Sequence, residues 1–132
     1  MADLRLSSDP PAFGWVMLVD DVRRFRDDRG CLLARTAKDA LGLLRRHRRQ
    51  RIAELWLDHD LGRDAAGRPL TVMPVVAELA AAAAAGDPYR IGVVYVHTAN
   101  PTGAVAMRSA LAAAGYEVQR HHAPIWRHHH GS

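Results

Sequence analysis

The sequence predicts a single-domain α/β protein built on a parallel five-stranded sheet in the flavodoxin-like order 2-1-3-4-5. Short apolar runs of strand length alternate with longer segments whose apolar residues recur at helical spacing. The short runs contain few polar residues, which is typical of a parallel sheet that is covered on both faces. Right-handed crossovers leave few possible topologies, and this order is one of them. A chain of 132 residues has the size of one domain.

Two strands and a helix are expected in the first part of the chain. Residues 15–19 and 31–36 are apolar runs of strand length. The charged segment 22–30 between them ends at a glycine, so we expect a loop or one short helical turn in place of a full first helix. Apolar residues at helical spacing predict a helix over 37–49, with Thr36 as its N-cap.

The middle of the chain is expected to contain a strand, a turn and a helix. The strand covers 54–57, and the segment 61–69 has the glycine and proline content of a turn. The helix covers about 70–85. Pro74 is tolerated in a first helical turn, which allows this helix to begin later than residue 70.

The last part of the chain completes the sheet. Residues 91–96 predict the fourth strand, and 102–114 predict a third helix that ends at Gly115. A fifth strand is expected over 116–120. The residues after Pro124 have no regular pattern, so we expect an irregular tail in place of a final helix.

Composition and charge exclude several classes of protein. The chain is 48% hydrophobic and 24% charged, as expected for a globular protein in water, and no segment has the pattern of a transmembrane helix. The first fourteen residues lack the basic end and apolar stretch of a secretory signal, so we expect a cytoplasmic location. Cys31 is the only cysteine, which excludes an intrachain disulfide and a cysteine metal cluster.

The formal net charge is +4, and arginines are concentrated over residues 45–51. This balance permits a partner that carries phosphate. The run itself is better explained as the solvated end of a helix, where cations offset the helix dipole. The arginine run is therefore no evidence for specific DNA binding. We expect no membrane partner, since no segment has the pattern of a transmembrane helix.

Polar residues follow three of the predicted strands, at the point where each strand ends. In a parallel sheet of this order, the carboxyl ends of the three strands lie along one edge, where open α/β sheets bind their ligands. The polar residues are therefore expected to share one pocket. The three clusters are Asp20-Asp21, Asp58-His59-Asp60 and His97-Thr98-Ala99-Asn100.

The acids of the first two clusters suggest a metal site. Asp20, Asp21 and Asp58 offer the oxygen ligands that Mg²⁺ or Mn²⁺ prefers, and such an ion keeps open positions for water and phosphate. Successive side chains alternate in direction, so at least one of the paired acids can turn inward. The alternative is that each aspartate only caps its turn, which three acids on adjacent strand ends make less convincing.

The histidines are candidates for moving protons. His97 ends an apolar strand beside several carboxylates, which would fix its tautomer and raise its basicity. His59 is a second candidate, although a single loop histidine is more often a surface residue. Asp60 either joins the site or caps the loop before Gly62, and the sequence favours neither role.

The third cluster also offers groups for binding phosphate. Thr98 supplies a hydroxyl, and the helix that follows supplies backbone N–H groups. Asn100 precedes Pro101 and is readily explained as the N-cap of that helix, with phosphate binding as the alternative.

The acid pair Asp20 and Asp21, the aspartate Asp58 and the pair Thr98-Ala99 resemble the receiver domains of bacterial response regulators. The resemblance implies that the acid pair holds Mg²⁺, that Asp58 accepts a phosphoryl group and that Thr98 contacts it. Receivers also use a lysine near the end of the fifth strand. The only lysine here is Lys38, and residues 120–124 have no lysine where the resemblance would place one.

The segments Leu-Asp-His-Asp-Leu-Gly (57–62) and His-Thr-Ala-Asn-Pro (97–101) resemble the cyclic-phosphate processing receiver domains. That resemblance implies action on cyclic phosphate ends of RNA or of related nucleotides. It divides the chain into an N-terminal extension over 1–14, a receiver-like domain over 15–126 and a histidine-rich tail over 127–132. The tail is either native or an expression tag, and we assign it no function.

The expected function is that of a metal-assisted phosphoesterase. His97 would be the acid or base and His59 or Asp60 its counterpart, with Asp20, Asp21 and Asp58 on the metal. Two alternatives remain open. One is a signalling module phosphorylated on Asp58, and the other is a domain that binds a nucleotide end without turning it over.

Overall fold

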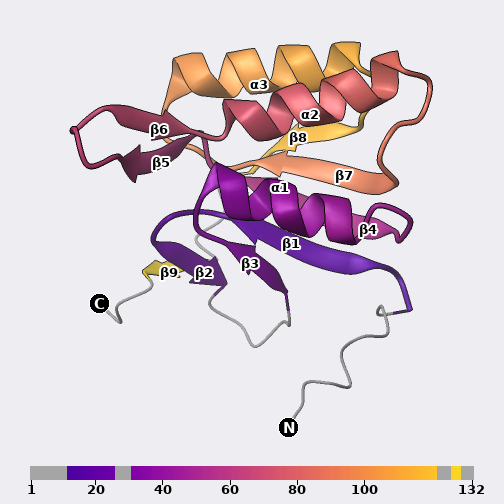
Figure 1. The fold of residues 1–132 in the computed structure, drawn as a ribbon, viewed down its shortest axis with the longest axis horizontal. Helices are drawn as coiled ribbons and strands as arrows, with labels where there is room; N and C mark the ends of the chain where they lie inside the picture. Colours follow the sequence, from indigo (N-terminus) through magenta and orange to yellow (C-terminus); the bar gives the residue numbers. More distant parts are fainter. Residues whose placement is uncertain (1–11, 26–30, 122–125, 129–132) are drawn as a thin grey trace, which may run out of the picture.

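Five parallel strands form the central sheet in the order β3-β1-β4-β7-β8, which confirms the predicted order 2-1-3-4-5 (Figure 1). The computed structural model describes residues 12–25, 31–121 and 126–128. Within these residues, no helix is long and apolar enough to cross a membrane. The strands are β1 (Trp15–Val19), β3 (Leu32–Ala34), β4 (Ile52–Leu57), β7 (Ile91–Val96) and β8 (Val118–Arg120).

The three helices, α1 (Ala37–Arg46), α2 (Met73–Ala84) and α3 (Pro101–Ala113), pack on the same face of the sheet (Figure 1). Their buried side chains share one core with alternate strand residues such as Met17 and Leu55. The expectation that helices cover both faces is wrong for the described residues. Among the described residues, no helix lies between β1 and β3, and none follows β8.

The helix starts follow the sequence signals. The Thr36 hydroxyl accepts a hydrogen bond of 3.0 Å from the Asp39 N–H, so the predicted cap of α1 is confirmed. The Asn100 side chain caps α3 in the same way, by accepting from the Gly103 N–H at 2.9 Å. Helix α2 begins at Met73, later than residue 70, with Pro74 in its first turn.

Two short antiparallel ribbons differ from the prediction. The segment expected to be a simple turn forms the hairpin of β5 (Asp60–Arg63) and β6 (Pro69–Thr71). Strand β2 (Arg23–Phe25) lies in the expected loop and pairs with β9 (Trp126–His128), so the expected irregular tail is wrong for these three residues. Strands of three or four residues are too short to show a period, and β2 and β9 are distant in sequence.

Some predictions fall on residues outside the described part of the chain. These are most of the N-terminal extension, part of the charged connection, the segment that follows the fifth strand and the end of the tail. The residues concerned are 1–11, 26–30, 122–125 and 129–132.

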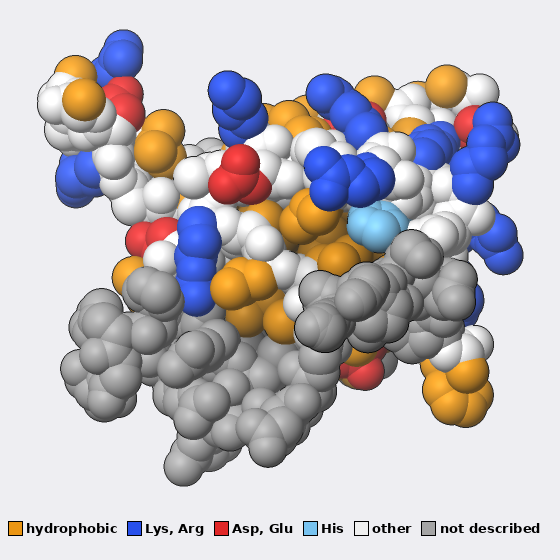
Figure 2. All heavy atoms as spheres, turned by 60° about the horizontal axis from the view of Figure 1, so that its bottom comes forward, with side chains coloured by type: hydrophobic (Ala, Val, Ile, Leu, Met, Phe, Trp, Pro, Cys, Tyr) orange, Lys and Arg blue, Asp and Glu red, His pale blue; other side chains and the backbone are white. Residues whose placement is uncertain are grey.

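Aromatic side chains occupy the face of the sheet opposite the helices. The rings of Trp56 and Tyr95 are stacked with centroids 4.2 Å apart, and His121 packs edge-on against Trp56 at 4.8 Å. Leu18 and Trp56 are buried on this side. Figure 2 shows an apolar area beside the residues that are not described. These rings therefore form a small second core in the absence of described helices on this face.

A buried tyrosine network joins α1 and α2 to the loop before β7. The Tyr89 hydroxyl donates to Glu78 Oε2 at 2.7 Å, and Arg45 donates to the other oxygen of Glu78 at 3.0 Å. Arg48 lies over the Tyr89 ring, 4.0 Å from its centroid. Two arginines of the basic run therefore have structural partners, in agreement with a helix end rather than a dedicated nucleic-acid surface.

Replacing Tyr89 by phenylalanine should lower the free energy of unfolding by about 1–2 kcal/mol, because the hydrogen bond to the carboxylate is lost. Burial, and secondly the hydrogen bond to Glu78, raises the pKa of Tyr89 to about 12 from 10.0. Because the pKa of Tyr89 is higher in the folded protein than in the unfolded chain, the neutral hydroxyl contributes to the free energy of unfolding. This contribution is fully present below pH 10 and is lost as the pH rises from 10 to 12. Urea unfolding at pH 7 and across that range measures both effects.

Tyr95→Phe is the matched control for this variant, because no hydrogen bond of the Tyr95 hydroxyl is seen among the described residues. Equal destabilisation by the two variants would show that the Glu78 hydrogen bond contributes nothing specific.

Candidate functional site

The ends of β1, β4 and β7 bring Asp20, Asp58 and His97 side by side. Val19, Leu57 and Val96 are paired across these three neighbouring strands, and each site residue follows one of them directly. The backbone hydrogen bonds between the strands continue to the site residues. The Asp58 N–H donates to the Val19 carbonyl and the His97 N–H donates to the Leu57 carbonyl, each at 3.1 Å. Parallel register is therefore what assembles the site.

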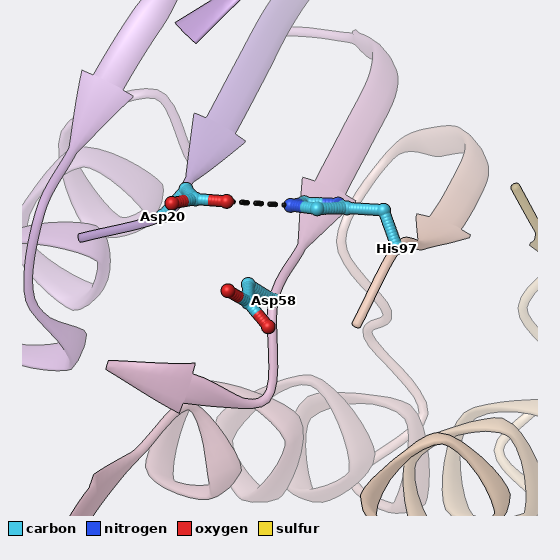
Figure 3. Close-up of side chains that lie close together, drawn as sticks. All are labelled: Asp20, Asp58 and His97. Atoms are coloured by element: carbon cyan, nitrogen blue, oxygen red, sulfur yellow. Dashed lines mark hydrogen bonds and ion pairs between the residues drawn. The ribbon is translucent and has the colours of Figure 1, made fainter. Parts of the chain in front are cut away.

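The side chains of Asp20 and His97 point toward each other, with Asp58 beside them (Figure 3). His97 Nε2 lies 3.0 Å from Asp20 Oδ2, and both side chains are fully buried. The other oxygen of Asp20 accepts from the Val22 N–H at 3.0 Å, which fixes the orientation of the carboxylate. One ligand atom of each residue lies within 4.8 Å of the others.

This group could hold a divalent cation, because its possible ligand atoms are carboxylate oxygens and an imidazole nitrogen. His97 Nε2 and Asp20 Oδ2 are hydrogen-bonded at 3.0 Å in this structure, so a cation held by both atoms would take the place of the proton between them. The mixed oxygen and nitrogen set is compatible with Mn²⁺ as well as Mg²⁺. The cluster contains His97 but not Asp21, so a role for Asp21 on the metal stays a prediction.

A hollow of about 740 Å³ lies beside this cluster, between the strand ends and the β5–β6 hairpin. Its volume is that of a site for a small molecule. Asp21, half-buried Asp58, His59 and Thr98 line it, whereas Asp20 and His97 do not. The Thr98 oxygen accepts from the Asn100 N–H at 3.1 Å, which leaves the hydroxyl proton to donate to a ligand. The predicted residues thus form a cluster in which Asp20 and His97 are buried and an open hollow, and Asp58 belongs to both.

A hydrogen-bond network holds His59 at the side of the hollow. His59 Nδ1 lies 2.8 Å from Asp60 Oδ1, and the Asn100 amide donates to the same oxygen at 3.3 Å. The hydrogen bond from His59, and secondarily that from Asn100, holds the pKa of Asp60 below its ordinary value. An ionised Asp60 accepts the Nδ1 proton, which leaves His59 Nε2 as the basic ring atom. In this structure Asp60 and Asn100 therefore orient His59, and Asn100 also caps α3.

Two glycines shape the site and were not anticipated from the sequence. A Cβ on Gly103 would lie 2.4 Å from His59 Cγ, so the imidazole rests directly against the first turn of α3. Gly62 has a φ of +84° and allows β5 to pass close to Asp21. The only sequence signal for Gly103 is that a glycine stands in the first turn of a helix. Arg63 also lines the hollow. An arginine near the strand ends was expected to steady the phosphate, but no sequence signal singled out this one.

A family model for the cyclic-phosphate processing receiver domain matches residues 15–113. The match includes the ends of β1, β4 and β7, together with the hairpin and every residue that lines the hollow. No curated protein and no solved structure matches the chain. The family match covers well over half of the sequence and agrees with the strand order and with the polar clusters at the strand ends. The chain therefore belongs to the cyclic-phosphate processing receiver domain family.

Proposed function

We propose that this protein is a metal-assisted phosphoesterase that opens cyclic phosphate ends of RNA or nucleotides. The observation that carries the proposal is the group of buried Asp20, half-buried Asp58 and buried His97 at an open hollow that His59 and Thr98 also line. A phosphoacceptor alone does not require an oriented histidine in the lining of the hollow. Hydrolysis requires charge stabilisation and a proton carrier at one place.

Asp20, Asp58 and His97 would hold Mg²⁺ or Mn²⁺. When bound, such an ion activates a water and offsets negative charge on phosphate oxygens. The Thr98 hydroxyl and the N–H groups at the start of α3 would orient the phosphate. His59 Nε2 would move a proton, either from the attacking water or to the leaving ribose oxygen, as one phosphorus–oxygen bond replaces another. His97 is buried in the cluster, which favours metal binding over direct contact with the substrate.

The direct test is incubation of the purified protein with a 2′,3′-cyclic nucleotide and Mg²⁺ or Mn²⁺, with the nucleoside monophosphate as the product to be measured. His59→Gln should lower turnover about a hundredfold, because the proton carrier is lost, but should leave metal affinity unchanged. His97→Ala should lower both. No turnover by the wild type above the His97→Ala background would contradict the proposal.

Two other functions remain as outcomes of the same test. Asp58 and Thr98 share the hollow, as a phosphoacceptor site requires. Lys38, the only lysine of the chain, is exposed in α1 and does not line the hollow, so the charge partner of a receiver is not supplied by a lysine there. Labelling of Asp58 by a small phosphodonor without hydrolysis would favour signalling. Tight binding of the cyclic nucleotide without product would favour a sensing domain.

A further inference from the structure

The β5–β6 hairpin forms one wall of the hollow, and its first residue, Asp60, belongs to the candidate site. Asp60 opens β5 and pairs with Thr71 at the end of β6, and the Val72 N–H donates to the His59 carbonyl at 2.9 Å. Figure 1 shows the hairpin projecting away from the sheet and helices. Its position relative to the strand ends is therefore fixed at its base.

The turn of the hairpin is also ordered. Asp64 Oδ1 accepts from the N–H groups of Ala66 and Arg68, each at 2.9 Å, and Asp64 Oδ2 accepts from the Arg68 guanidinium at 2.8 Å. Gly67 adopts a φ of +81°, which the turn requires. The charge of Arg68 is therefore paired with Asp64 inside the hairpin.

Arg63 differs from Arg68 in its position and in its partners. It is the only arginine or lysine among the described residues that line the hollow, where Asp21, Asp58 and Asp60 supply three acids. Its Nη1 donates to the Gly67 carbonyl at 2.8 Å, which tethers the guanidinium to the wall. A guanidinium has five N–H donors in a planar fork that suits phosphate, so one tether leaves most of them for a ligand.

The size of the hollow exceeds what one phosphoryl group needs. A volume of about 740 Å³ is that of a site for a whole nucleotide. The proposed metal ligands and Thr98 lie at the strand ends, whereas Arg63 lies on the hairpin, where Pro69 and Leu70 add apolar surface. A cyclic phosphate at the strand ends would therefore leave Arg63 to contact a different part of the substrate.

We infer that Arg63 binds a second phosphate of the substrate, one nucleoside away from the cyclic phosphate. This inference rests on the proposed function and makes the hairpin the element that distinguishes substrates with one phosphate from those with two. The second phosphate is either the 5′-phosphate of a mononucleotide or the phosphodiester of an RNA end. Both offer the oxygens that the guanidinium recognises.

Three substrates test the inference: a nucleoside 2′,3′-cyclic phosphate, the same compound with a 5′-phosphate, and a dinucleotide that ends in a 2′,3′-cyclic phosphate. The wild type should have a kcat/KM at least about tenfold higher for the two-phosphate compounds. Arg63→Gln should remove most of that difference. Arg68→Gln, in which the lost charge lies outside the hollow, should preserve it.

A preference for the dinucleotide alone would identify an RNA end as the source of the second phosphate, and a preference for both would identify the phosphate itself. Equal loss on all three substrates in Arg63→Gln would overturn the inference.

Binding measured by calorimetry with Mn²⁺ separates this inference from the proposed function. If no compound is hydrolysed but the wild type binds the 5′-phosphorylated compound more tightly, and Arg63→Gln removes the difference, then the second-phosphate site stands and the catalytic proposal falls. Equal affinity of the wild type for compounds with one and two phosphates would overturn the inference, whatever the turnover.

Discussion

Asp58→Asn should weaken divalent-cation binding and cyclic-phosphate turnover together. Asparagine keeps the size of the side chain and an oxygen that can accept the Asp60 N–H, which lies 3.4 Å from Asp58 Oδ1. It removes one of two carboxylates from a group whose ligand atoms lie within 4.8 Å of one another. Loss of a charged ligand should lower Mn²⁺ affinity and turnover by at least about a hundredfold. Calorimetry with Mn²⁺ and release of nucleoside monophosphate measure the two effects.

Asp87→Asn is the matched control, because it removes one negative charge from an exposed loop residue, whose side chain pairs with Arg48. Its metal affinity and turnover should equal those of the wild type. Both variants should unfold at similar urea concentrations, since neither removes buried apolar surface. An Asp58→Asn protein that still binds Mn²⁺ and hydrolyses the cyclic nucleotide would remove Asp58 from the proposed metal site.

Local sequence signals were sufficient for the main elements of the fold. The run of residues 91–96 has the bounds of β7, and Thr36 and Asn100 are caps whose chemistry is visible without a structure. The β2–β9 and β5–β6 ribbons could not be predicted in the same way. Each strand is three or four residues long, and their pairing depends on contacts that periodicity does not record.

The site was predictable to the extent that it depends on parallel register. Adjacent strands of one direction end at one edge, so Asp20, Asp58 and His97 meet there. The sequence did not determine which acid of the first pair turns inward. That choice depends on the last pleat of β1 and on the Val22 N–H bond to Asp20, which leave Asp21 on the hollow instead.

The supporting residues were harder to anticipate. The partners of Asp60 include Asn100, which follows a different strand, and their hydrogen bond exists only after the chain folds. The contact between His59 and Gly103 is of the same kind, because it depends on how closely α3 approaches the loop after β4. Such approaches between distant segments have no local signature in one sequence.

Gly103→Ala should lower turnover by at least about a hundredfold while leaving metal affinity unchanged. The new Cβ would lie 2.4 Å from Cγ of His59 and 2.8 Å from Nδ1, so the ring has to move. The loop cannot simply withdraw, because the His59 carbonyl accepts from the Val72 N–H and Asp60 is paired with Thr71. Ring rotation breaks the bond between His59 Nδ1 and Asp60, and displacement of a proton carrier by about 1 Å is sufficient for this loss.

Gly42→Ala separates this effect from the general consequence of alanine in a helix. Gly42 lies within α1, and a Cβ there would have no atom within 4 Å outside its own helix backbone. That variant should gain up to about 1 kcal/mol of stability from helix propensity and keep its turnover. In a His59→Gln background, Gly103→Ala should cause no further loss, because both changes act through the same ring. Wild-type turnover in the single Gly103→Ala variant would show that the oriented imidazole of His59 takes no part in the reaction.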